Sequence, residues 1–127
     1  MINPPAFIWT LLSFPVNSLD SEIFIKAKNL ANQVNKKTCV IYGGTELSEL
    51  VASRWKTQIN ENSKSKAFIG SIPEVHHNEI LSWDADLEGS KSNFVLIFLR
   101  DDTENPQIVK RFNLTNELLQ EKVQIFN

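Results

Sequence analysis

The stretch NFVLIFL at residues 93–99 is the strongest strand signal in the chain. After its first asparagine it is entirely apolar, and its β-branched and aromatic side chains suit an extended backbone. A continuous apolar run of this length is typical of a strand buried on both faces, as in parallel sheets. Two further runs, TCVIYGG at 38–44 and AFIGSIP at 67–73, stop at glycine or proline, and KVQIF at 122–126 indicates a fourth strand.

Segments with helical spacing of apolar residues lie between these strands. We expect a short helix over residues 75–83 and then an acidic loop through Gly89. Longer helices are predicted to begin at capping residues, which are Asp20 or Ser21, Thr45, Asn105 with Pro106 behind it, and Thr115. Strands alternating with helices predict an α/β fold, a three-layer αβα sandwich with a parallel sheet of about four strands.

The composition restricts the classes of partner. With 127 residues, 42% hydrophobic and 22% charged, the chain is expected to form one domain over residues 1–127. A net charge of −2 gives no electrostatic reason to expect nucleic acid or an anionic membrane as partner. A single cysteine excludes an internal disulfide and a thiolate zinc cage, and it suits a reducing compartment, so we expect a cytoplasmic protein.

The N-terminal stretch at 4–16 is apolar, but no Lys or Arg precedes it and Pro4, Pro5 and Pro15 interrupt it. This pattern argues against both a signal peptide and a membrane span. We expect residues 1–19 to form an arm or a short helix packed on the domain.

Glu61 and His77 are the candidate catalytic residues. Glu61 comes just before the strand at 67–73, and His77 follows just beyond it. Ligands of such sheets bind beyond the carboxyl ends of the strands, and we expect both side chains to reach the rim of the sheet, where a carboxylate and an imidazole can perform acid–base chemistry. On spacing alone, a solvated helix-end carboxylate and a capping histidine are the commoner interpretation. His76 is expected to be a surface or hydrogen-bonding histidine.

Other motifs favour structural roles. The turn GGTE at 43–46 could cradle a phosphate, but a tight turn with Thr45 as helix cap is favoured. The segment DADLEG at 84–89 imitates a calcium loop, but the acid required at its twelfth position would be Val95. Cys39 lies in a predicted buried strand and is expected to be a core residue.

The stretch RWKTQINENSKSKAFIGSIPEVHHNEILSW at 54–83 resembles the bifunctional phosphoglucose/phosphomannose isomerase family, a member of the sugar isomerase (SIS) domain superfamily. Weaker similarity covers AKNLA, VIYGG, FVLIFLRD and VKRF, so the resemblance extends over most of the chain. The residues that carry it are Arg54, Lys56, Gln58, Asn60, Glu61, Asn62, Lys64, Ala67, Phe68, Pro73, Glu74, His77, Asn78, Glu79 and Trp83.

The resemblance implies an SIS-like fold and an aldose–ketose isomerase that converts glucose 6-phosphate or mannose 6-phosphate to fructose 6-phosphate. By this resemblance Glu61 is the base that moves a proton between C1 and C2, and His77 assists ring opening, reaching the site of a partner subunit. No metal and no organic cofactor are implied. An oligomer is expected, either of identical copies or with a partner chain that supplies a missing half.

The family also has features for which residues 1–127 show no counterpart. A phosphate-binding serine and threonine loop and a substrate-contacting arginine belong to a first subdomain, and a catalytic lysine follows the final strand. We therefore expect an isomerase domain that is incomplete on its own. The alternative is a non-catalytic SIS-type module that binds a phosphosugar or only dimerises. The substitution Glu61→Gln discriminates the two, because an isomerase should lose turnover and keep ligand binding, whereas a binding module has no turnover to lose.

Overall fold

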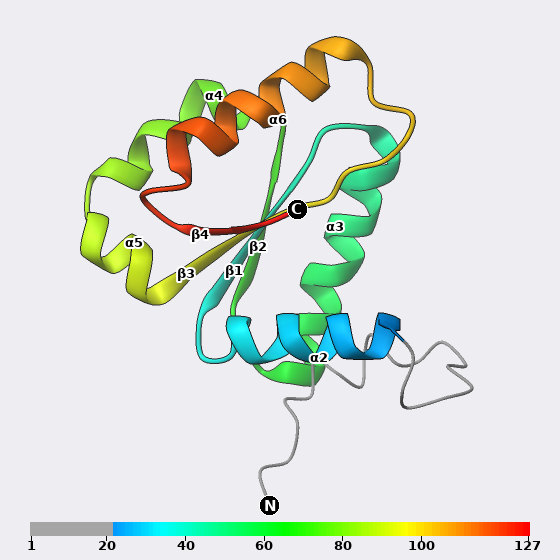
Figure 1. Cartoon of the computed structure of the whole chain (residues 1–127), viewed down its shortest axis with the longest axis vertical. Helices are drawn as coiled ribbons and strands as arrows, with labels where there is room; N and C mark the ends of the chain where they lie inside the picture. The colour runs from blue at the N-terminus through cyan, green and yellow to red at the C-terminus, as the bar shows by residue number, and fades with distance from the viewer. Residues whose placement is uncertain (1–21) are drawn as a thin grey trace, which may run out of the picture.

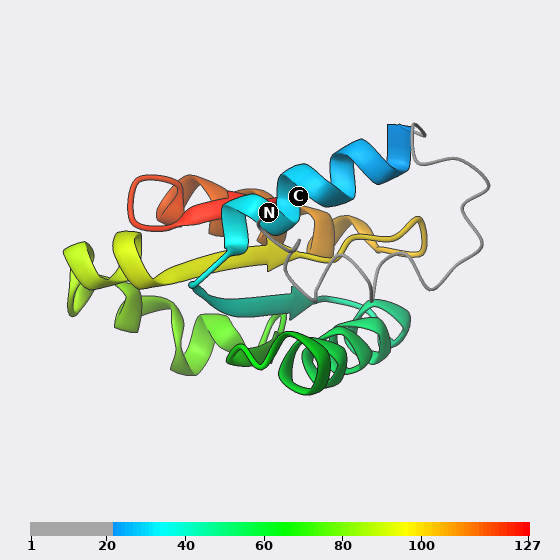
Figure 2. The ribbon, with the colours of Figure 1, turned by 90° about the horizontal axis from the view of Figure 1, so that it is seen from below.

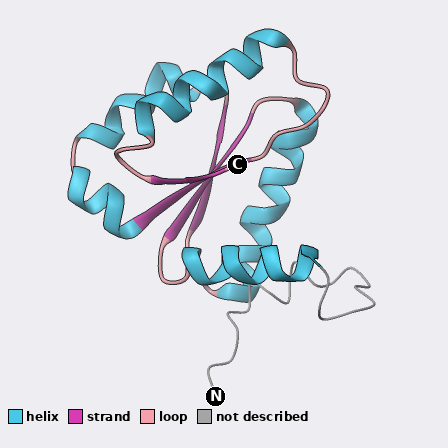
Figure 3. Ribbon diagram, in the orientation of Figure 1, coloured by secondary structure: helices cyan, strands magenta, loops and turns pink. Residues whose placement is uncertain are grey.

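In the computed structural model, which describes residues 22–127, a parallel sheet lies between two layers of helices (Figure 1). The predicted N-terminal arm at 1–19 lies outside the described residues. Figure 3 separates the central strands from the surrounding helices by colour. In chain order the elements are α2 (Glu22–Val34), β1 (Thr38–Gly43), α3 (Glu46–Gln58), η1 (Ile59–Ser63), β2 (Ala67–Ser71), α4 (Val75–Asn78), η2 (Ile80–Asp84), α5 (Leu87–Asn93), β3 (Phe94–Phe98), α6 (Pro106–Leu119) and β4 (Gln124–Phe126).

The strand order is β2-β1-β3-β4, and every neighbouring pair is parallel. Three of these strands, β4 (red), β3 (yellow) and β1 (teal), lie side by side in Figure 2. The chain moves outward from β1 to β2 and then crosses back to β3 on the other side of β1. Two strand edges therefore remain unpaired in the described sheet, the outer edge of β2 and the outer edge of β4.

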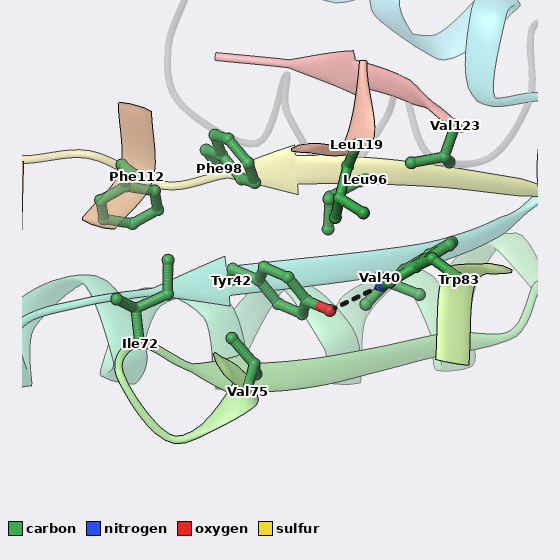
Figure 4. Packing of buried hydrophobic residues seen from close by; sticks show 10 residues of the cluster. All are labelled: Val40, Tyr42, Ile72, Val75, Trp83, Leu96, Phe98, Phe112, Leu119 and Val123. Carbon is green, nitrogen blue, oxygen red and sulfur yellow. Dashed lines mark hydrogen bonds between the residues drawn. The ribbon is translucent and has the colours of Figure 1, made fainter. Parts of the chain in front are cut away.

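Alternate residues of the two central strands point to opposite helical layers, as a pleated strand requires. Cys39 and Ile41 of β1 pack in one core with α2 and α3. Val40 and Tyr42 pack in the other core, toward α4, η2 and α6, where Phe112 is fully buried (Figure 4). The burial of both faces explains why β1 and β3 are continuous apolar runs, and the predicted three-layer α/β fold is confirmed.

The helix starts predicted from capping residues are confirmed at Thr45 and Asn105. The Thr45 side chain accepts a hydrogen bond from the backbone N–H of Ser48, and Asn105 accepts from Gln107 and Ile108. Each bond satisfies a backbone N–H group that has no partner within the helix. At Thr45 the structure supports the capping interpretation of the GGTE turn.

Three predictions in the second half of the chain were wrong. Thr115 does not begin a helix but lies inside α6, where its hydroxyl bonds to the carbonyl of Arg111 one turn earlier. The expected acidic loop through Gly89 ends early, because α5 begins at Leu87, where the Asp86 carboxylate caps the helix through the Gly89 N–H. The predicted helix at 75–83 is two short helices, α4 and η2, separated at Glu79.

Candidate functional site

The loops after β1 and β3 meet at the carboxyl edge of the sheet, where the strand order reverses. Asp101 bridges them, because its carboxylate accepts hydrogen bonds from the hydroxyls of Thr45 and Thr103. Hydrogen bonds from Thr103 and then from Thr45 hold the pKa of Asp101 below its usual value. A carboxylate thus lies at the start of α3, which disfavours a phosphate at this helix end.

At the same edge of the sheet, Arg100 contacts Glu104 and Phe112. Its guanidinium donates to both carboxylate oxygens of Glu104 at 2.6–2.8 Å and stacks on the Phe112 ring at 4.4 Å. The Glu104 side chain is only 4% exposed, so its carboxylate is shielded from solvent within this ion pair. Arg100 thus joins the loop after β3 to α6 through Glu104 and Phe112.

Glu61 and His77 lie at opposite ends of β2. Glu61 is in η1, before the strand, at the amino edge of the sheet, and His77 is in α4, after the strand, at the carboxyl edge. Figure 1 shows α4 at the top and the end of α3, which η1 continues, at the bottom. The five residues of β2 alone separate these edges by on the order of 13 Å. Within one chain the two side chains are thus not brought together, because η1 and α4 lie at opposite edges.

Both candidates are exposed. Neither makes a side-chain hydrogen bond or ion pair with another residue in the described range 22–127. The residue before Glu61 differs in this respect, because the Asn60 side chain accepts a hydrogen bond from the Ala67 N–H at 3.0 Å and joins η1 to β2.

His76 connects α4 to α6. Its Nε2 lies 2.6 Å from the buried Thr115 hydroxyl, and an Arg111 Nη1 lies 3.1 Å from its Nδ1. The guanidinium can only donate, so Nδ1 accepts and Nε2 carries the proton that it donates to Thr115. Burial and the charge of Arg111 both lower the pKa of His76. The expected hydrogen-bonding role of His76 is confirmed, with the specific partners supplied by α6.

Glu79 and Trp83 hold the crossover helices against β1. The hydroxyl of fully buried Tyr42 donates to Glu79 Oε1 at 2.9 Å. It accepts from Trp83 Nε1 at 3.2 Å, the hydrogen bond drawn in Figure 4. Burial is the main reason that the pKa of Tyr42 is raised. Glu79 and Trp83 therefore hold the segment after β2 against β1.

Comparison with known proteins identifies the family. A family model described as the bacterial phospho-glucose isomerase C-terminal SIS domain matches residues 25–127, which include all four strands of the sheet. The chain belongs to this family.

Several curated proteins are similar to this SIS domain. The bifunctional phosphoglucose/phosphomannose isomerase of Aquifex aeolicus is 36% identical over 97 residues, covering 76% of this chain and 29% of that protein. The isomerase of the same name from Caldicellulosiruptor bescii is 33% identical over 93 residues, covering 73% and 27%. A D-glucosamine-6-phosphate 4-epimerase of Sulfolobus acidocaldarius is 39% identical over 51 residues, covering 40% and 16%.

The SIS domain thus spans less than a third of the length of the curated isomerases it matches. No solved structure matched the chain significantly. The resemblance to the phosphoglucose/phosphomannose isomerase family is confirmed by these findings, and a sugar isomerase SIS domain is the function class they support.

A groove of about 510 Å³ lies beside β2 in this SIS domain. Its walls include Phe68 of β2, Trp83 of η2 and Asn93 of α5. Within residues 22–127 no three His, Cys, Asp or Glu side chains gather as metal ligands would. No helix in that range has the length and apolar character needed to cross a membrane.

Cys39 is buried in β1, as predicted, and burial raises the pKa of its thiol to about 11. The thiolate that would act as a nucleophile is therefore scarce at neutral pH. Cys39 is a core residue of the SIS domain.

Replacing Tyr42 by phenylalanine is expected to lower the free energy of unfolding by roughly 1–3 kcal/mol, because the buried Trp83 N–H loses its acceptor. Urea unfolding followed by tryptophan fluorescence measures this change. Glu79→Gln is the matched control, since glutamine still accepts from the Tyr42 hydroxyl. An equal loss in both variants would contradict a specific role of the hydroxyl.

The lowered pKa of His76 predicts a pH dependence of stability. The folded state disfavours the protonated imidazole, so the unfolded chain binds more protons, and stability is lost as the pH falls through the usual pKa of histidine, about 6.5. His76→Gln can keep both partners without titrating, and its unfolding free energy should vary less with pH below about 6.5. His77→Gln, a change at the exposed neighbour, should leave the wild-type dependence in place. The same pH dependence in wild type and His76→Gln would contradict the assignment.

Proposed function

We propose that this SIS domain takes part in the isomerisation of glucose 6-phosphate or mannose 6-phosphate to fructose 6-phosphate. The proposal extends to this chain the activity named for relatives that are 33–36% identical to it. We propose a cytoplasmic location, because a sugar phosphate substrate and a single buried thiol are both compatible with a reducing compartment.

In the proposed reaction Glu61 acts as the base. Its carboxylate removes the proton from C2 of the open-chain aldose and returns it to C1, through an enediol, to give the ketose. The side chain has free access to substrate because it is exposed. General acid–base catalysis of this kind needs a carboxylate beside both C1 and C2. The sugar as a whole is neither oxidised nor reduced.

His77 has the second proposed role. Opening the sugar ring requires a proton for the ring oxygen, and an imidazole can donate and accept protons near neutral pH. Because His77 and Glu61 lie at opposite ends of β2, the proposal needs His77 from one chain and Glu61 from another. An oligomer is therefore part of the proposed function.

The observation that carries the proposal is the contrast between these two residues and their neighbours. Asn60 and His76 use their side chains to hold the fold together. Glu61 and His77 remain exposed without a side-chain hydrogen bond in the described part of the chain, which leaves both groups available for chemistry.

A coupled assay tests the proposal. Purified chain is supplied with fructose 6-phosphate, and the glucose 6-phosphate formed is oxidised by a coupling dehydrogenase. Turnover that depends on Glu61 supports the isomerase. Binding of the sugar phosphate without turnover, in both wild type and Glu61→Gln, would instead support a non-catalytic phosphosugar-binding module.

A further inference from the structure

We propose that the amino edge of the sheet binds the phosphate group of a sugar phosphate between Lys36 and Lys64. These two lysines stand at the entries to neighbouring strands, and Lys64 follows Glu61, the proposed base, by three positions. The choice of a sugar phosphate as ligand rests on the proposed function, whereas the anion site itself is argued from the backbone and the charges at this edge.

Lys36 and Lys64 share an uncommon backbone conformation. Their φ angles are 65° and 52°, and in the described part of the chain, 22–127, no other residue is given a positive φ. This left-handed region suits glycine, because a side chain raises its energy. Lys36 follows the end of α2 and Lys64 ends η1, and helices commonly terminate in a left-handed residue. The turns therefore explain the left-handed backbone but not why a lysine, rather than a glycine, stands at both positions.

The two turns enter neighbouring strands at matching positions. The first pair between β1 and β2 is Cys39 with Ala67. Lys36 and Lys64 each stand three positions before that pair, since 39 − 36 = 67 − 64 = 3. The Cys39 N–H donates to the carbonyl of Lys66 at 3.0 Å and joins the two entering segments, which lie at the lower end of the sheet in Figure 1. Because neighbouring strands lie about 4.8 Å apart, two long lysine side chains from these turns can reach one phosphate.

The fold makes no use of either ammonium group. Lys36 and Lys64 are exposed, and neither side chain makes a hydrogen bond or an ion pair with another residue of the range 22–127. Lys37 differs, because its Nζ donates to the carbonyl of Lys91 at 3.2 Å. Backbone conformations that cost energy are found preferentially at sites that bind ligands. A lysine held at such a cost in both turns, without a partner in the described residues, points to a ligand for the two charges.

Charge is distributed unevenly between the two edges of the sheet. The segments 35–37 and 59–66, which lead into β1 and β2, contain four lysines and one acid, Glu61. The segments 44–49 and 99–104, which follow β1 and β3 at the carboxyl edge, contain five acids and one arginine. In a chain with a net charge of −2, an anionic ligand is thus favoured at the amino edge and disfavoured at the opposite one.

A phosphate monoester has the chemistry that this arrangement favours. It carries a charge of about −1.5 to −2 at pH 7 and offers three acceptor oxygens, so two ammonium groups can bind it together. A sugar phosphate anchored at Lys64 has its carbon chain beside η1, which also carries Glu61. The same edge of the sheet then holds both the phosphate and the carbons that react.

Calorimetric titration of the full chain tests the site with three probes: fructose 6-phosphate, inorganic phosphate and fructose. Fructose 6-phosphate should bind more tightly than inorganic phosphate, and fructose should show no binding. Lys36→Gln and Lys64→Gln should each raise the Kd for fructose 6-phosphate about tenfold, because each removes one charge from the phosphate. Lys110→Gln, which removes an exposed charge on α6, is the matched control and should leave the Kd unchanged.

Glycine variants separate binding from folding. Lys36→Gly and Lys64→Gly should weaken binding as much as the glutamine variants, but they should not lower the melting temperature, because glycine adopts positive φ without strain. A melting temperature that falls in both glycine variants while the Kd stays at the wild-type value would show that the lysines serve the fold, and would overturn the site.

The remaining outcomes distinguish the site from the proposed function. No binding of either phosphate, or a Kd that neither glutamine variant changes, would overturn the site. Equal binding of inorganic phosphate and fructose 6-phosphate, weakened in both glutamine variants, would support the anion site and contradict the sugar as part of its ligand. Lysine-dependent binding without turnover in the coupled assay would contradict the proposed function and leave the site standing, whereas turnover with an unchanged KM in both glutamine variants would do the reverse.

Discussion

Replacing Glu61 by glutamine is expected to lower the isomerase kcat by about 10²–10⁴-fold, the usual contribution of a general base. Glutamine has the shape of the carboxylate but cannot take a proton from C2. Because Glu61 is exposed and makes no side-chain hydrogen bond in the described part of the chain, its replacement should not disturb the fold. The change should therefore appear in kcat, with the melting temperature and sugar-phosphate binding preserved.

The coupled assay measures this loss. Glu88→Gln, at an exposed position of α5, is the matched control for the removal of one negative charge and should keep wild-type turnover. If Glu61→Gln keeps the kcat of the wild type, Glu61 is not the base and the proposed mechanism is wrong.

Replacing Phe112 by alanine is expected to lower the free energy of unfolding by about 3–5 kcal/mol, the range for large-to-small changes of a buried phenylalanine. The ring is fully buried, packs on Phe98 with centroids 5.2 Å apart, and supports the Arg100 guanidinium at 4.4 Å. Its loss leaves a cavity in the core between the sheet and α6, and removes the surface on which Arg100 stacks.

Urea unfolding of Phe112→Ala gives the size of this loss. Leu114→Ala is the control on the same helix, since Leu114 is 44% exposed and should cost far less. Comparable losses in the two variants would show that the Phe112 side of α6 is not the buried one.

The sheet could be predicted from the sequence because its central strands are buried on both faces. Residues of β1 and β3 that point toward α3 and those that point toward α6 are both apolar, so no helical periodicity competes with the strand signal. The capping residues Thr45 and Asn105 were found for a similarly local reason, since their side chains bond to N–H groups two or three positions ahead.

The errors arose where a tertiary contact decides the role of a polar residue. Thr115 looks like a helix cap, but His76 lies 39 positions away in the chain and supplies the partner that stabilises Thr115 inside α6. At 84–89 the acidic residues suggested a loop, whereas Asp86 alone is a cap that starts α5. Single-sequence patterns do not reveal such partners in advance.

The candidate site shows a similar limit. The order of Glu61, β2 and His77 along the chain places the two residues at opposite edges of the sheet, but the sequence alone does not show what contacts either side chain. Asp101 was not singled out, although it follows the strand at 93–99 at the edge where functional residues were expected. Its position directly after this strand is the signal that the sequence carries.

The most direct test of the central claim, that Glu61 and His77 act together across two copies, is to mix the two inactive variants. Glu61→Gln and His77→Asn chains are purified separately, mixed under conditions that exchange subunits, and assayed for fructose 6-phosphate conversion. Mixed dimers carry one intact site each, so random exchange should restore about a quarter of the wild-type activity. If the mixture stays as inactive as its parents while the wild type turns over, the two residues do not share a site between copies and the account is wrong.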